Sequence, residues 1–177
     1  SCYDHGRNSD CYKDLAHMLV KKYQLEDIFK VLEQNESQTK VFQACHEVLH
    51  FVGQFEFGQI KNVNTALGEG NPVCFAGYFH GVLEAYLLTQ HLIAGDPASV
   101  EALGAEISTL CSSDMEPKIY NECLHGLGHA LMYASDSDLP SALQLCDRLP
   151  SIGAREWCYS GAFMENSTSS TNPDHPN

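Results

Sequence analysis

The sequence predicts an all-α protein made of tandem helical hairpins, each stapled by a disulfide bond. Three observations predict this fold. Apolar residues recur at helical spacing, eight cysteines fall at matched offsets, and a Cys-x-x-Gly-x-x-His frame returns along the chain. A chain of 177 residues can bury a sizeable core. We therefore expect a single domain over residues 1–165.

Helical periodicity dominates the pattern of apolar residues. Leu15, Met18 and Leu19 fall on one helical face, as do Ile28 and Leu32, whereas the strict alternation typical of strands is missing. Turn-forming residues divide the chain into about nine helices. The predicted breaks lie at residues 35–37, 68–72, 95–97, 114–117, 136–140 and 150–153.

The last residues differ in composition from the rest of the chain. From Asn166 onward they are mostly Ser, Thr, Asn and Pro, which cannot bury enough apolar area to fold. We expect a flexible tail or linker over residues 166–177, with room for a further domain after it.

The charge balance excludes one class of partner. Lys and Arg total 10 against 23 Asp and Glu, so the net charge is -13 and the surface repels phosphate backbones. We expect no nucleic-acid partner. The apolar runs are also shorter than the roughly 20 residues needed to cross a bilayer, so we expect a protein that does not span a membrane.

The cysteines indicate an oxidising compartment. Their number is even and no two form the Cys-x-x-Cys pair that is typical of a thiolate metal site. We expect a secreted or otherwise extracytoplasmic protein with four disulfides. Two glycosylation sequons, at residues 35–37 and 166–168, agree with a secreted glycoprotein.

Cysteine spacing indicates a weak internal repeat. Leu110-Cys111 and Leu145-Cys146 each end a predicted helix, and each cysteine is followed by another twelve positions later, at Cys123 and Cys158. The repeat predicts stacked hairpins, each with an outer helix, a loop and an inner helix that opens at a cysteine.

The same frame recurs after these cysteines. It places Gly77, Gly126 and Gly161 three residues after a cysteine, and His80 and His129 six residues after one. In the copy that begins at Cys158, Met164 takes the histidine position and Glu165 follows it, offering a soft ligand, a carboxylate or core packing. A more divergent copy begins at Cys45.

Equal spacing predicts two disulfides within hairpins, and elimination gives two more. Each hairpin bridge would contribute roughly 3 kcal/mol in the chain-entropy model. The predicted pairs are Cys111–Cys123 and Cys146–Cys158 from spacing, and Cys2–Cys11 and Cys45–Cys74 by elimination. Bridged cysteines cannot serve as thiolate ligands, so the chemistry falls to histidines and carboxylates.

Residues 46–50 form a His-Glu-x-x-His motif. Two imidazoles four residues apart lie on one helical face, and the glutamate between them can act as a general base toward a metal-bound water. We therefore predict His46 and His50 as metal ligands and Glu47 as a catalytic base.

Two further predicted helices repeat the four-residue spacing. His125 and His129 form one pair, and His80 with Glu84 forms another. The alternative is that the histidines are structural core residues. The predicted metal ligands are His46, His50, His80, His125 and His129, and the predicted catalytic carboxylates are Glu47 and Glu84. Four histidines lie outside the frame and are expected at the surface or in the core: His5, His17, His91 and His175.

Glycines inside predicted helices need an explanation, because each costs about 1 kcal/mol relative to alanine. Gly81, Gly128 and Gly161 are examples. Close helix packing is one interpretation. Approach of a cofactor to the backbone is the other, and it would permit haem between helices with axial histidines.

Over residues 46–56 the chain resembles the zinc-peptidase signature. His46 and His50 match the metal ligands, Glu47 matches the base, and Gly53 falls at the glycine of the longer form of the motif. That form has a third histidine ligand where this chain has Glu56. The related version that uses a downstream helical glutamate would recruit Glu84. The resemblance implies a zinc-dependent hydrolase.

These features predict a histidine-rich, metal-dependent protein that acts on a small molecule or peptide, as a hydrolase of the His-Glu-x-x-His type or as a redox metalloenzyme. Zinc is the expected metal, with iron or copper as alternatives and haem after them. The competing hypothesis is a non-catalytic protein. It would be a metal or haem carrier, or a helical-repeat binding module with structural histidines.

Overall fold

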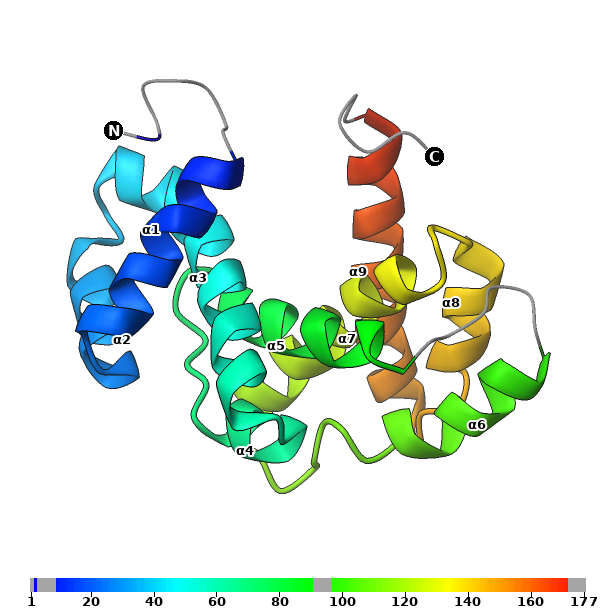
Figure 1. Ribbon diagram of the computed structural model, residues 1–177. Coiled ribbons are helices and arrows are strands. Elements are labelled where there is room, and N and C mark those ends of the chain that lie inside the picture. The colour runs from blue at the N-terminus through cyan, green and yellow to red at the C-terminus, as the bar shows by residue number, and fades with distance from the viewer. Residues whose placement is uncertain (1, 3–8, 91–96, 172–177) are drawn as a thin grey trace. The chain divides into compact units, whose positions relative to one another are not determined.

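The computed structural model describes residues 2, 9–90 and 97–171. Within these ranges it contains nine α-helices and no strand, which confirms the all-α prediction (Figure 1). The described chain forms two compact units, Ser1–Val82 and Leu83–Asn177, and the boundary between them falls inside one helix. Each unit is described by itself.

The first unit is organised around one long helix. The helix α3 packs against α1, α2 and α4, and Figure 1 shows α1 beside it. Leu49 and Val52 of α3 are fully buried. The helices of this unit are α1 (Ser9–Lys22), α2 (Leu25–Asn35), α3 (Thr39–Ile60), α4 (Val63–Gly68) and the first part of α5 (Gly77–Leu88).

Tyr78 of α5 contacts two other helices of the first unit, α2 and α4. The ring of Tyr78 is buried and meets Phe29 of α2 edge-on, with 5.3 Å between ring centroids. The Tyr78 hydroxyl donates a hydrogen bond to the carbonyl oxygen of Ala66 at 3.0 Å. Burial, together with the charges of nearby glutamates, raises the pKa of Tyr78 above its ordinary range, so this hydroxyl stays protonated and keeps its role as a donor.

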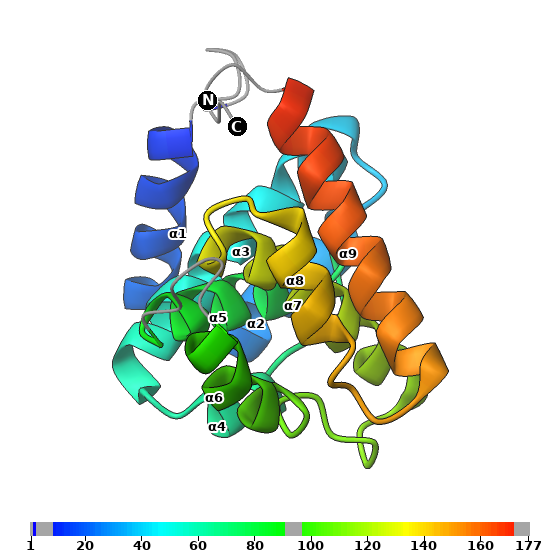
Figure 2. The ribbon, with the colours of Figure 1, turned by 90° about the vertical axis from the view of Figure 1, so that its right-hand side faces the viewer.

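The second unit is organised around a pair of long helices. Figure 2 shows α8 beside α9, and α7, α8 and α9 all pack together. Leu124, Leu127 and Leu131 of α7 and Leu145 of α8 are fully buried. The helices of this unit are α6 (Pro97–Ile107), α7 (Pro117–Ala134), α8 (Leu139–Cys146), α9 (Ile152–Thr171) and the rest of α5.

Side-chain caps explain two of the predicted breaks. Glu116 accepts hydrogen bonds from the backbone of Lys118 and Ile119, with Pro117 in the first helical position. Asp138 accepts one from the backbone nitrogen of Ser141 at the start of α8. These caps satisfy backbone donors that the first helical turn leaves without partners.

All eight cysteines are bridged, and all four predicted pairs are confirmed. The pairs are Cys2–Cys11, Cys45–Cys74, Cys111–Cys123 and Cys146–Cys158, with Cα–Cα distances of 5.5 to 5.8 Å. Four intramolecular disulfides suggest an oxidising, extracytoplasmic environment. Among the described residues, no helix combines the length and the apolar character that crossing a bilayer requires.

One detail of the predicted hairpins is wrong. The inner helices do not open at a cysteine, because α7 begins at Pro117, before Cys123, and α9 begins at Ile152, before Cys158. The caps and turns that start these helices lie upstream of the disulfides.

The repeat and the domain boundaries stay predictions. The tandem repeat of hairpins and the single-domain organisation are not tested by the helices alone. The helix α9 continues past the predicted start of the tail at residue 166 to Thr171, and residues 172–177 lie outside the described part.

Candidate metal site

Two glycines bring α7 and α9 of the second unit into backbone contact. A Cβ atom on Gly128 would lie 2.0 Å from the carbonyl oxygen of Cys158, and one on Gly161 would lie 1.9 Å from that of His125. No side chain fits at either position. For these two residues, close helix packing is therefore the better explanation of why glycine occurs inside a helix.

This crossing places side chains of α9 against the histidines of α7. The Nδ1 atom of His125 lies 2.8 Å from the hydroxyl oxygen of Ser160. The Nδ1 atom of His129 lies 2.8 Å from a carboxylate oxygen of Glu165. Each imidazole of the α7 pair thus has a hydrogen-bond partner on α9.

These partners fix which nitrogen of each ring carries a proton. A carboxylate only accepts, so the His129 Nδ1 atom donates to Glu165. The Ser160 hydroxyl donates to the carbonyl oxygen of Trp157 at 2.7 Å, so its oxygen accepts from the His125 Nδ1 atom. In both neutral rings the lone pair then lies on Nε2.

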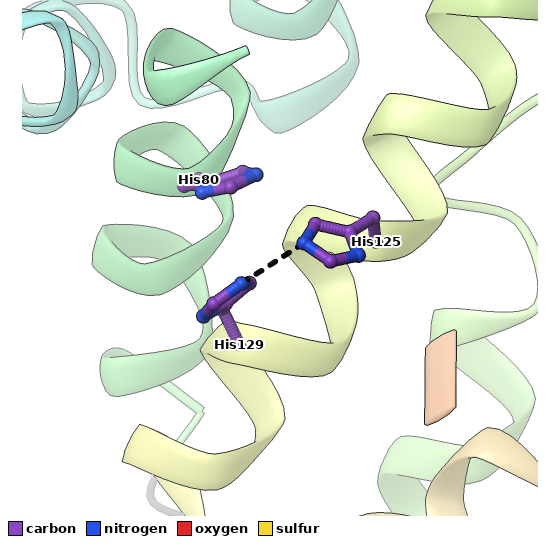
Figure 3. A group of neighbouring side chains, drawn as sticks. All are labelled: His80, His125 and His129. Atoms are coloured by element: carbon purple, nitrogen blue, oxygen red, sulfur yellow. Dashed lines mark hydrogen bonds between the residues drawn. The ribbon is translucent and has the colours of Figure 1, made fainter. Parts of the chain in front are cut away.

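The two Nε2 atoms face each other. They are 3.1 Å apart across one turn of α7 (Figure 3). Two lone pairs at this distance repel unless a proton or a cation lies between them. Two imidazole nitrogens bound to one tetrahedral zinc ion, at 2.0–2.1 Å each, are about 3.3 Å apart. The observed separation is therefore close to that of two ligands of one metal ion.

Burial adds to the suitability of these histidines as ligands. His80 and His129 are buried and His125 is half-buried, so each lies in surroundings poorer in competing water than a surface histidine. The described residues thus include histidines that could hold a metal ion.

The first unit contains a second helix crossing built on glycines. A Cβ atom on Gly53 would lie 2.2 Å from the carbonyl oxygen of Tyr78, and one on Gly81 would lie 1.8 Å from that of His50. A third close approach joins Gly77 to the carbonyl oxygen of His46, at 2.3 Å. The helices α3 and α5 are therefore also in backbone contact.

Three histidines gather at this crossing. The rings of His46 and His80 have centroids 5.0 Å apart, and the ring of His50 lies 6.3 Å from each of them. Two imidazoles on one tetrahedral zinc have centroids about 5 Å apart. The first distance matches this geometry, and the other two exceed it.

The ring partners in the first unit differ from those in the second. The His46 Nδ1 atom donates to the carbonyl oxygen of Cys74 at 3.1 Å. The Gln54 amide nitrogen lies 3.4 Å from the His50 Nδ1 atom, and because an amide NH₂ only donates, this Nδ1 atom accepts. In neutral His50 the proton is then on Nε2.

The carbonyl that holds His46 belongs to an unusual turn. Cys74, Phe75 and Ala76 all have left-handed backbone conformations, with φ between 55° and 57°, just before α5 begins. Such residues are costly when they are not glycine. The Cys45–Cys74 disulfide anchors the turn beside His46.

Each unit, taken by itself, brings predicted site residues together. Within the units, His46, His50 and His80 lie together, and so do His125 and His129. Glu47 is half-buried on α3, and Glu84 lies one turn after His80 on α5. Their roles as ligands or bases stay predictions.

The histidines outside the frame behave differently. His17 is exposed and its ring stacks on Phe55, with 4.9 Å between centroids. His5, His91 and His175 lie outside the described residues.

Sequence reasoning missed Ser160 and assigned no definite role to Glu165. Ser160 carries no motif, and the frame aligned Met164 with the histidines. Met164 is instead an exposed side chain of α9. The signal that could have found Ser160 is Gly161, because the residue before a contact glycine lies at the helix crossing.

Two half-buried glutamates lie on the helices that carry the predicted ligands. Burial raises the pKa of Glu122, one turn before His125, although Lys118 opposes the shift. Burial, helped by the charge of Glu69, raises the pKa of Glu56 on α3.

Comparison of the chain with protein families, with curated proteins and with solved structures finds no match.

Proposed function

We propose that this protein binds a divalent transition metal through imidazole nitrogens, with His125 and His129 as a chelating pair. The observation that carries the proposal is the 3.1 Å separation of their Nε2 atoms, with both Nδ1 atoms engaged by α9. A single ion would accept both lone pairs and remove their repulsion.

The donor chemistry supports zinc as the first candidate. Imidazole nitrogen suits zinc, copper, iron and nickel, whereas magnesium and calcium prefer oxygen ligands. Every cysteine is in a disulfide, so thiolate ligands do not compete. An extracytoplasmic location fits this donor set, because histidine keeps its ligand nitrogen under oxidising conditions that remove thiols.

A second candidate function rests on the first unit. The clustered rings of His46, His50 and His80 support metal binding at the His-Glu-x-x-His motif. With a metal-bound water beside it, Glu47 would act as general base in a hydrolysis. The helix α3 continues without a break through Gly53 to Ile60, so Glu56 lies about 9 Å along the axis from His50 and does not take the place of the third ligand.

Metal titration of tag-free, metal-free protein tests the first candidate. We expect the wild type to bind Zn²⁺ or Co²⁺, and His129→Ala to lose at least about 100-fold in affinity, more than the loss of an outer hydrogen-bond partner causes. His17→Ala, which removes a histidine that stacks on Phe55, is the control and should bind as the wild type does. Equal affinities for His129→Ala and the wild type, with the helix content of both unchanged, would contradict the proposal.

A further inference from the structure

We infer that Glu165 and Ser160 on α9 are positioning residues that set the metal affinity of the α7 pair and favour a doubly charged ion. This inference rests on the proposed function, because it concerns the outer partners of the same two ligands. Neither residue belongs to a metal-ligand motif.

The first step of the argument is that α9 is held in one register. The glycine crossing leaves no room for a shift, since a Cβ atom at either contact glycine would collide with the opposite backbone. The Cys146–Cys158 disulfide fixes α9 two residues before Ser160. A shift of one residue would move α9 by about 1.5 Å and break both 2.8 Å hydrogen bonds.

The second step is that the two partners differ in charge. Glu165 accepts a hydrogen bond from the His129 Nδ1 atom, which orients the ring as a ligand, and its carboxylate adds negative charge close to a bound cation. Ser160 is neutral, and its hydroxyl donates a hydrogen bond to the Trp157 carbonyl oxygen. His129 should therefore be the stronger ligand of the pair, and His125 the weaker.

The third step is that the His129–Glu165 pair is shielded from water. The side chains of His129 and Glu165 are only 10% and 13% exposed. Charge interactions weaken less in such surroundings than they do at an exposed pair. The carboxylate should therefore favour Zn²⁺ over singly charged Cu⁺, although Cu⁺ also accepts imidazole ligands.

Tautomer measurements on the metal-free protein give a readout that is independent of metal binding. Long-range ¹H–¹⁵N spectra of wild-type protein should show both His125 and His129 with the proton on Nδ1. In Glu165→Ala only His129 should lose this preference, and in Ser160→Ala only His125. Tautomers that are unchanged in both variants would overturn the inference.

Affinity measurements complete the test. We expect Glu165→Gln to weaken Zn²⁺ binding 10- to 100-fold and Cu⁺ binding less, and Ser160→Ala to weaken Zn²⁺ binding less than Glu165→Gln does. Glu156→Gln removes an exposed carboxylate from the same helix and should change nothing. Wild-type Zn²⁺ affinity in Glu165→Gln would overturn this inference and leave the proposed function intact. Absence of Zn²⁺ binding in the wild type would instead overturn the proposed function.

Discussion

Both units contain a helix crossing in which glycines contact the opposite backbone, but the side chains at the two crossings differ. In the first unit Gly53 lies three residues after His50, and in the second Gly128 lies three residues after His125. Both glycines contact a carbonyl oxygen of the opposite helix, and the opposite glycines, Gly81 and Gly161, contact the carbonyl oxygens of the two histidines. His50 and His125 therefore occupy corresponding positions.

The side chains around these positions are different. Four residues after His50 comes Gln54, whereas four residues after His125 comes His129. Immediately before the opposite glycine comes His80 in the first unit and Ser160 in the second. At the first crossing, imidazoles from two different helices therefore lie together. At the second crossing, both imidazoles come from α7, and a hydroxyl and a carboxylate of α9 contact their Nδ1 atoms. Backbone packing alone does not make a metal site, because the outer partners decide which nitrogen is available.

The largest expected effect comes from breaking a crossing. Gly161→Ala forces a Cβ atom to within 1.9 Å of a backbone oxygen, so we expect a loss of about 3 kcal/mol or more in the free energy of unfolding. Urea denaturation with the disulfides intact measures it. Gly153→Ala, on the same helix with open space around it, is the matched control and should lose no stability.

The same experiment applies to the first unit. Gly81→Ala meets the carbonyl oxygen of His50 at 1.8 Å, whereas Gly58→Ala on α3 meets nothing within 4 Å. We expect the first variant to lose as much stability as Gly161→Ala and the second to lose none. A Gly81→Ala protein as stable as the wild type would show that the crossings are not equivalent.

The next effect separates the two histidine groups. Replacing His125 and His129 together by alanine should reduce Zn²⁺ affinity at least about 100-fold, whereas replacing His46 and His50 together should reduce the affinity of the tightest site less than tenfold. The reason is that the Nε2 atoms of His125 and His129 lie 3.1 Å apart with both Nδ1 atoms engaged by α9, whereas the Nδ1 atom of His50 accepts from Gln54 and leaves its proton on Nε2. Isothermal titration of both double variants checks it, and the opposite order would assign the main site to the first unit.

A smaller effect is expected when the histidine spacing of α7 is introduced into α3. Gln54→His gives α3 a pair of histidines four residues apart, as on α7. In a protein that lacks His125 and His129, this substitution should restore Co²⁺ binding, roughly 10- to 100-fold weaker than in the wild type because the new ring lacks the contact that His129 makes with Glu165. Gln59→His, on the same helix but away from His50, serves as the control. Failure to restore any binding would mean that the spacing of the ligands is not enough.

Much of this arrangement could be predicted from the sequence, because it depends on local spacing. The helices follow from apolar periodicity and from caps such as Asp138, and the disulfides follow from equal offsets between cysteines. The four-residue spacing of His125 and His129 predicts one shared face, which the structure bears out.

The outer partners could not be predicted, because they depend on how two helices cross. The cysteine frame aligns Gly77 with Gly161, whereas the backbone contacts match Gly81 with Gly161, one helical turn later. A four-residue displacement leaves a residue on nearly the same helix face, so periodicity does not distinguish the two alignments. Ser160 can be identified as a partner of His125 only when the contact between Gly161 and the His125 carbonyl oxygen is known.

The smallest effect compares a half-buried glutamate in each unit. The pKa of Glu56 and the pKa of Glu122 are raised by burial, so each folded carboxyl holds its proton more tightly than the unfolded one. This costs stability at neutral pH, and the cost disappears as the pH falls below the unfolded pKa of about 4.3. Glu56→Gln should therefore stabilise the protein at pH 7 by less than about 1 kcal/mol, since the group is half-exposed, and should make no difference near pH 3. Glu122→Gln should gain less, because it also gives up the attraction of Lys118. Urea denaturation of both variants at pH 7 and at pH 3 measures these changes in stability. A Glu56→Gln protein that is less stable than the wild type at pH 7 would show that Glu56 has a favourable partner in the fold.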